Sequence, residues 1–159
     1  MTALDIYPLS EKPEFAETCA AWSFGEWGCN LRNDSLNQSI ARYKERAANT
    51  DKIPRTWVGM KGDKIAGMVS LVACDHEDRK DLTPWLASMY VHRTFRRQGC
   101  ASQLIQHLHK KAKELGFSRL YLFTPDAMAL YEKNGWRIIG QVRDPRGIHS
   151  HEKLMEISL

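Results

Sequence analysis

The chain has 159 residues, of which 43% are hydrophobic and 26% are charged, and its formal net charge is +4. This length and composition predict one soluble globular domain, over residues 1–159, and exclude a disordered or fibrous chain. The mild positive charge is well short of that of a protein that coats nucleic acid, and it suits a phosphorylated small molecule equally well.

The cysteines and the first residues of the chain bear on its compartment. The four cysteines form no C-x-x-C pair, and no histidine lies at zinc-finger spacing from them. We therefore expect reduced thiols, without a disulfide framework or a metal site. The first fifteen residues contain no apolar signal core, and no apolar run reaches membrane length. These features predict a cytoplasmic protein without a membrane partner.

The N-terminal third is predicted to contain one strand and two helices. Residues 3–9 favour a short strand, and Pro13 suits the first position of a helix. The glycines within 25–28 interrupt that helix, and Asp34 or Ser35 then caps a second one. The apolar stripe of this second helix consists of Leu36, Ile40, Tyr43 and Ala47.

The middle of the chain changes to a strand pattern. Residues 55–61 and 64–74 are predicted strands, joined by the turn residues Gly62 and Asp63. Both alternating sets of the second strand are apolar or small, which indicates a central strand buried on both faces. A polar loop follows, and residues 84–92 form the next predicted strand.

The C-terminal part alternates between helix and strand. A helix is predicted over 99–115, with one apolar face and Gly116 as its stop. The strand before this helix and the strand after it form a parallel crossover, while the earlier strands form hairpins. The predicted fold class is therefore α/β with a mixed sheet, in the order β-α-α-β-β-β-α-β-α-β-β. The last elements are a strand over 119–124, a short helix over 126–134, and strands over 136–142 and 151–159.

The stretch 92–105, HRTFRRQGCASQLI, places a glycine turn directly after a predicted strand and directly before an amphipathic helix. The first N–H groups of a helix lack backbone partners and carry partial positive charge, so a phosphate satisfies them. Gly99 lacks a Cβ and lets an anion approach the backbone, and Ala101 keeps the first turn slim. Arg96 and Arg97 add charge and donors. The alternative is an ordinary helix start that contains a glycine, because the motif alone is weak.

Arg96, Gly99 and Ala101 match the pattern Arg/Gln-x-x-Gly-x-Gly/Ala, in which the final alanine is a permitted variant. With these residues, the segment 84–136 resembles the acetyl-CoA-binding half of the GNAT superfamily of N-acetyltransferases. The predicted order of elements also matches that family over the whole chain. The resemblance implies a GNAT-like acyl-CoA N-acyltransferase fold and an enzyme that uses acetyl-CoA as its acetyl donor.

The short helix after the crossover carries the second part of the resemblance. The family has an alanine, a tyrosine four residues later, and then a glycine shortly before an aromatic residue. Ala127, Tyr131, Gly135 and Trp136 occupy these positions here. Where the family often has an asparagine, seven residues before the tyrosine, this chain has Thr124, which puts one side-chain contact with the cofactor in doubt.

The resemblance implies transfer of the acetyl group from acetyl-CoA directly to a primary amine of a small molecule or peptide. Tyr131 occupies the position that carries the general acid in the family. A phenol suits this role, because it is protonated at pH 7 and can protonate the departing thiolate. The alternative for this tyrosine is simple packing. In the family, the strand before the glycine turn supplies main-chain contacts, and the resemblance implies the same contacts to the carbonyl and the pantetheine arm here. The implied cofactor-binding residues are Met89, Val91, Arg96, Arg97, Gln98, Gly99, Cys100, Ala101 and Ser102.

The acceptor side is less defined by sequence. A lysine-like amine is almost entirely protonated at pH 7, so the site must take a proton from it or select the neutral form. Candidate bases are Glu26, Asp75, Glu77 and Asp81, although a solvated loop is the simpler interpretation of the run 75–81. Glu26 lies among tryptophans and glycines, and we expect it to receive the ammonium group.

Two other functions remain open from the sequence. The chain could be a CoA-binding sensor or regulatory module without turnover. It could also bind nucleic acid through Lys110, Lys111 and Lys113, although the solvated face of an amphipathic helix explains these lysines better. We expect acetyl-CoA and an amine acceptor as ligands, a monomer or homodimer, and no metal, nucleic acid or membrane. Acceptor specificity is expected to depend on the loops 22–35 and 74–84.

Overall fold

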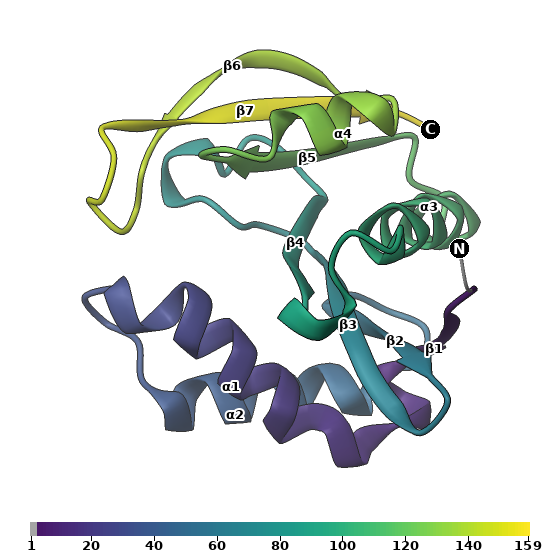
Figure 1. Cartoon of the computed structure of the whole chain (residues 1–159). Helices are drawn as coiled ribbons and strands as arrows, with labels where there is room; N and C mark the ends of the chain where they lie inside the picture. Colours follow the sequence, from purple (N-terminus) through teal and green to yellow (C-terminus); the bar gives the residue numbers. More distant parts are fainter. Residues whose placement is uncertain (1–2) are drawn as a thin grey trace.

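The computed structural model describes residues 3–159 and shows a seven-stranded mixed sheet with helices on both of its faces (Figure 1). The strand order is β1-β2-β3-β4-β5-β7-β6, with β4 and β5 parallel and the other neighbours antiparallel. The predicted fold class and order of elements are confirmed. The elements are β1 (Asp5–Pro8), α1 (Ala16–Glu26), α2 (Leu36–Ala48), β2 (Arg55–Lys61), β3 (Lys64–Val72), β4 (Trp85–Val91), α3 (Cys100–Glu114), β5 (Arg119–Thr124), α4 (Met128–Lys133), β6 (Arg137–Arg143) and β7 (His151–Ser158).

The two faces of the first four strands are covered by different helices. Cys19 of α1 and Tyr43 of α2 share a buried cluster with Met68 of β3. On the other face, Leu104 of α3 shares a larger buried cluster with Val69 of β3. Neighbouring residues of β3 therefore point into different cores, which confirms the prediction of a central strand buried on both faces.

Two details of the N-terminal helices differ from expectation. Gly25 does not end its helix, which continues to Glu26, because a glycine inside a packed helix costs only about 1 kcal/mol. Leu36 was expected in the buried stripe of α2 but is 43% exposed. Ser39 takes the buried position instead, since its hydroxyl donates a hydrogen bond of 2.9 Å to the carbonyl oxygen of Ala20. The predicted cap is correct, as the Ser35 hydroxyl accepts a hydrogen bond from a backbone N–H of the first turn.

Strand β4 is irregular where it leaves the sheet. Ser70 pairs with Ala87 and Met68 with Tyr90, so β4 carries one extra residue at this point, and Ser88 within it has a φ of 52°. On its other edge, β4 runs parallel to β5, and among the described residues the two strands pair at one position, Trp85 with Tyr121. The sheet therefore splits beyond this pair, and Figure 1 shows β4 running from the β5–β7–β6 half to the half that carries α1 and α2.

Two expectations concern the chain as a whole. All four cysteines are free, as predicted. None of the helices within residues 3–159 is both long and apolar enough to cross a membrane.

Candidate active site

The turn into α3 combines two left-handed backbone positions. Gly99 precedes the helix with a φ of 77°, and Arg97 has a φ of 60°. Only glycine adopts this region without steric cost, which explains the residue at the helix start. The first hydrogen bond of the helix runs from the N–H of Gln103 to the carbonyl oxygen of Gly99, at 3.2 Å. The amide groups before Gln103 in the helix are therefore left for another acceptor, at the positive end of the helix.

Gln98 fixes this turn through its side chain. Its Oε1 accepts a hydrogen bond of 2.7 Å from the Nζ of Lys61, at the end of β2. Its Nε2 donates a hydrogen bond of 3.1 Å to the carbonyl oxygen of Thr94. The turn is thus tied to the neighbouring strand and to its own first residues, while its backbone remains open.

The two arginines before the glycine lie differently. The Nε of Arg96 donates a hydrogen bond of 2.9 Å to the carbonyl oxygen of Val91, and its guanidinium lies 5.6 Å from the ring centre of Tyr90. Arg96 therefore holds the turn against the end of β4, and the Val91 carbonyl already has a donor. Arg97 is exposed and makes no hydrogen bond or ion pair with other described residues. Met89 lies in the irregular part of β4, on an edge that β5 does not pair.

Tyr131 lies on α4, in the buried cluster against which Met89 of β4 packs. Its side chain is 6% exposed, and its ring meets that of Trp136 edge to face at 5.9 Å. Its hydroxyl makes no hydrogen bond within the described chain, yet it is not among the polar atoms sealed from solvent. Burial, together with the nearby carboxylate of Asp75, raises the pKa of Tyr131 above its usual value. The hydroxyl is therefore protonated at neutral pH and accessible.

Asn134, three residues after Tyr131, joins α4 to α3. Its Nδ2 donates hydrogen bonds to the Ser102 hydroxyl at 3.1 Å and to the Leu130 carbonyl at 2.8 Å. Its Oδ1 accepts a hydrogen bond of 2.9 Å from Gln106. No local pattern in the sequence marks this residue, because its partners are 28 and 32 positions away in the chain.

Thr124 stands where the family often has an asparagine. It is 6% exposed, and its hydroxyl accepts a hydrogen bond of 3.2 Å from the N–H of Ala127. This threonine therefore shapes the turn into α4.

The loop after β3 is fixed by a buried histidine. The Nδ1 of His76 accepts a hydrogen bond of 3.1 Å from the N–H of Asp78, so its Nε2 carries the proton and lies 2.8 Å from the carbonyl oxygen of Arg143. Its ring packs edge-on against Phe123 at 5.1 Å. This histidine fixes the backbone next to Asp75 against the end of β6.

Asp75 has an unusual electrostatic environment. Water reaches its side chain, but the surrounding protein reduces the hydration of the carboxylate and raises its pKa to about 7. Arg46 of α2 opposes this shift, and Glu152 of β7 adds to it. Its charge also acts on Tyr131. Asp75 thus interacts electrostatically with groups of α2, β7 and α4.

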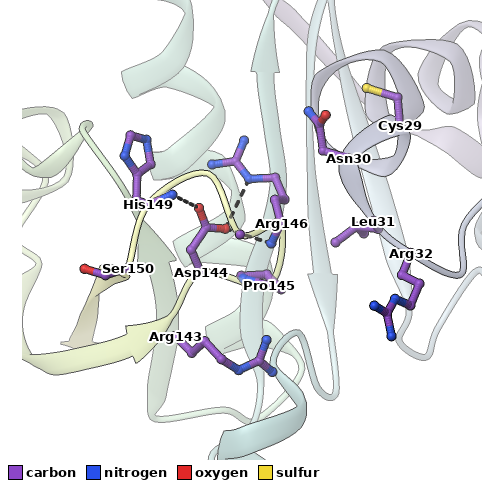
Figure 2. A pocket seen from close by; sticks show the side chains of 11 residues that line it. Cys29, Asn30, Leu31, Arg32, Arg143, Asp144, Pro145, Arg146, His149 and Ser150 are labelled. Atoms are coloured by element: carbon purple, nitrogen blue, oxygen red, sulfur yellow. Dashed lines mark hydrogen bonds and ion pairs between the residues drawn. The ribbon is translucent and has the colours of Figure 1, made fainter.

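A cavity of about 610 Å³ lies between residues 29–32, after α1, and residues 143–150, between β6 and β7 (Figure 2). Asp144 organises the second of these loops by accepting hydrogen bonds of 2.8 Å from the N–H groups of Arg146 and His149. The guanidinium of Arg146 in turn binds Glu152, at 3.0 Å. One wall of the cavity is therefore a rigid, buried ion network.

The other candidate carboxylates have different surroundings. Glu26 is exposed at the C-terminal end of α1, without a hydrogen bond or ion pair to the described residues. Glu77 binds Arg143, and Asp81 binds Arg79 at 2.9 Å, both near the surface. Of these carboxylates, Asp75 acts electrostatically on Tyr131, whereas Glu77 and Asp81 are each held by an arginine.

Comparisons with known proteins concern the same region. The family model described as "Acetyltransferase (GNAT) family" matches residues 16–136. Human N-acetyltransferase 8 is 32% identical over 89 residues, which are 54% of this chain and 39% of that protein. The chain thus spans less than half the length of this relative.

Several solved structures share the fold. An aminoglycoside 6'-N-acetyltransferase complexed with coenzyme A superposes with a TM-score of 0.74 at 15% identity, covering 97% of this chain and 96% of that one. A GNAT-family acetyltransferase from Streptococcus pneumoniae gives 0.69 at 20% identity, covering 98% and 99%. One from Elizabethkingia anophelis, with acetyl-CoA bound, gives 0.53 at 21%, covering 66% and 76%.

Proposed function

Because this chain belongs to the GNAT acetyltransferase family, we propose that it transfers the acetyl group of acetyl-CoA to a primary amine of a small molecule or peptide. The observation that carries the proposal is the split between β4 and β5, which opens directly onto the left-handed glycine turn before α3. Strand edge, turn and helix start then form one continuous path for a phosphorylated thioester.

The turn is suited to the pyrophosphate of acetyl-CoA. The unpartnered amides at the start of α3 offer donors and positive potential, and Arg97 is free to add charge. Arg96 and Gln98 keep the turn in shape. Structural neighbours with coenzyme A or acetyl-CoA bound share this fold, which supports the same ligand here. The proposed cofactor-binding residues remain Met89, Val91, Arg96, Arg97, Gln98, Gly99, Cys100, Ala101 and Ser102.

The thioester is proposed to lie between β4 and Tyr131. Attack by the amine moves negative charge onto the carbonyl oxygen, which a backbone N–H on the unpaired edge of β4 can stabilise. Met89 is the favoured donor, because it lies in the bulge. The thiolate then takes the proton of the Tyr131 hydroxyl, which is accessible and held in its protonated form.

The acceptor is proposed to bind in the cavity between residues 29–32 and 143–150. Glu26, near the first of these loops, is proposed to attract its ammonium group. The names of a human N-acetyltransferase and of aminoglycoside N-acetyltransferases among the relatives are consistent with an amine. We also propose a cytoplasmic monomer or homodimer, which the four free cysteines suit.

A thiol-release assay with acetyl-CoA tests the proposal. Kanamycin, spermidine, a lysine-containing peptide and a peptide with a free amino terminus serve as acceptors, with mass spectrometry of the products. Amine-dependent release of CoA together with an acetylated amine supports the enzyme. Calorimetric binding of CoA without release for any amine favours instead a sensor or regulatory module without turnover.

A further inference from the structure

We propose that Asp75 is the general base that takes the proton from the acceptor amine, an inference that rests on the proposed acetyltransferase function. Asp75 follows β3 in the loop that leads to β4, the strand that pairs with both β3 and β5.

The position of Asp75 is fixed by residues on both sides of the split. Trp85 pairs with Val72 of β3 and with Tyr121 of β5, so the halves of the sheet meet there. Asp75 lies three residues beyond Val72, and His76 next to it is pinned to the backbone of Arg143. Arg143 also lines the cavity. The loop that carries Asp75 is therefore tied to the rim of the cavity, and we place the bound amine within reach of its carboxylate as part of the proposal.

Charged groups of two other elements act on the carboxylate, but neither of them is bound to it. Arg46 of α2 donates to the Ser70 hydroxyl at 3.1 Å and lies over the Tyr43 ring. Glu152 of β7 is held by Arg146. Asp75 itself makes no hydrogen bond or ion pair with the described residues, so its oxygens remain free for a substrate.

The electrostatics suit proton transfer near neutral pH. The surrounding protein raises the pKa of Asp75 to about 7, with Arg46 lowering it and Glu152 raising it. A base is most effective when its pKa lies near the working pH, because enough is deprotonated while the affinity for a proton is high. A carboxylate of ordinary pKa takes a proton from an ammonium group far less readily.

In the proposed step, the acetyl group moves from the sulfur of CoA to the amine nitrogen. The ammonium group loses one proton to the Asp75 carboxylate, which passes it to water. The nitrogen lone pair forms the bond to the acetyl carbon, the bond from that carbon to sulfur breaks, and the thiolate takes the hydroxyl proton of Tyr131. The second proton of the nitrogen restores the Tyr131 phenol. The products are the amide, CoA and one proton released to solvent.

Asp75→Asn tests the proposal, with Asp81→Asn as its matched control in the same loop. The kcat of the Asp75→Asn enzyme, measured with the best acceptor among the amines named above, is expected to fall by about 10²–10⁴-fold, while Asp81→Asn stays near wild type. The wild-type kcat should rise with pH up to about 7, and this limb should disappear in Asp75→Asn. Asp75→Glu should recover part of the activity and restore the limb.

Thermal unfolding gives a readout that needs no acceptor. The folded protein raises the pKa of Asp75 above its unfolded value, so the charged carboxylate costs stability as pH rises from about 4 to about 7. The Tm of Asp75→Asn should exceed that of wild type by more at pH 8 than at pH 5, by about 2–4 °C for a chain of this size.

The outcomes separate the two hypotheses. A wild-type enzyme that acetylates no amine overturns the proposed function, and the base is overturned with it. Acetylation with an unchanged kcat and pH profile in Asp75→Asn overturns the base alone. An equal Tm difference at both pH values shows that the folded site does not disfavour the charged carboxylate, and it also contradicts the inference.

Discussion

The two sides of the candidate site are built in different ways. The cofactor side is one continuous stretch, from the irregular end of β4 to the first turn of α3, and it presents mainly backbone groups. The acceptor side is assembled from residues 29–32, the loop around Asp75 and residues 143–150, and it presents side chains. Local dihedral preferences determine the first side, whereas long-range packing determines the second. Substitutions on the two sides should therefore fail in different ways.

The largest effect is expected on the cofactor side. Gly99→Glu places a side chain and a negative charge where the pyrophosphate is proposed to lie, at a residue with a φ of 77°. We expect CoA affinity to fall by more than about 100-fold, or about 2.7 kcal/mol, because the new carboxylate repels the pyrophosphate and its side chain fills the space beside the turn. Isothermal calorimetry with CoA measures the effect.

Gly116→Glu is the control for backbone strain. Gly116 follows the other end of α3 with a φ of 91°, and a Cβ there meets no atom within 4 Å. It should lose similar stability in thermal unfolding while binding CoA normally. If a folded Gly99→Glu protein also bound CoA normally, the anion site would lie elsewhere.

Tyr131→Phe should separate binding from chemistry on the same side. The substitution removes one oxygen from a ring that stays packed against Trp136. We expect kcat and kcat/KM to fall together by about 10²–10⁴-fold, since the hydroxyl acts mainly in the transition state. Acetyl-CoA affinity should be nearly unchanged, and the loss should shrink with an acyl donor whose thiol is more acidic.

Tyr7→Phe, on β1, controls for loss of a tyrosine hydroxyl far from the split. Single-turnover kinetics establish whether chemistry or product release limits the rate. A chemical step of normal speed in Tyr131→Phe would assign this tyrosine to packing and the proton to water.

The same contrast explains what the sequence could predict. The order of elements, the central position of β3 and the glycine turn follow from patterns within a few residues of one another, and the structure confirms them. The bonds of Asn134 and the surroundings of Asp75 depend on residues that only the folded chain brings together. Leu36 shows the same limit, because a periodic pattern does not reveal which positions a neighbouring helix covers.

Asn134→Leu tests whether the two helices must be held together for turnover. The substitution leaves Ser102 and Gln106 without their partner, and we expect a loss of about 1–3 kcal/mol in unfolding free energy. The position of Tyr131 should shift, so kcat should fall more than CoA affinity. Gln106→Ala, which removes one of the bonds at an exposed residue, should show a smaller loss of both. Equal losses in kcat and CoA affinity would contradict a role in positioning Tyr131.

The smallest effect is expected from Glu26→Gln, on the acceptor side. Glu26 is exposed at the end of α1, so its attraction for an ammonium group is screened by water and salt. We expect the KM for a cationic acceptor to rise by about 1.5- to 5-fold, the usual range for an exposed ion pair, with little change in kcat or in the KM for acetyl-CoA. The difference from wild type should vanish in high salt.

Glu17→Gln, at another exposed position of the same helix, is the control. Because Glu26 would act on the approach of the amine and Asp75 on its proton, the first should alter KM and the second kcat. If Glu26→Gln instead lowered kcat and removed its dependence on pH, the two carboxylates would have to exchange roles.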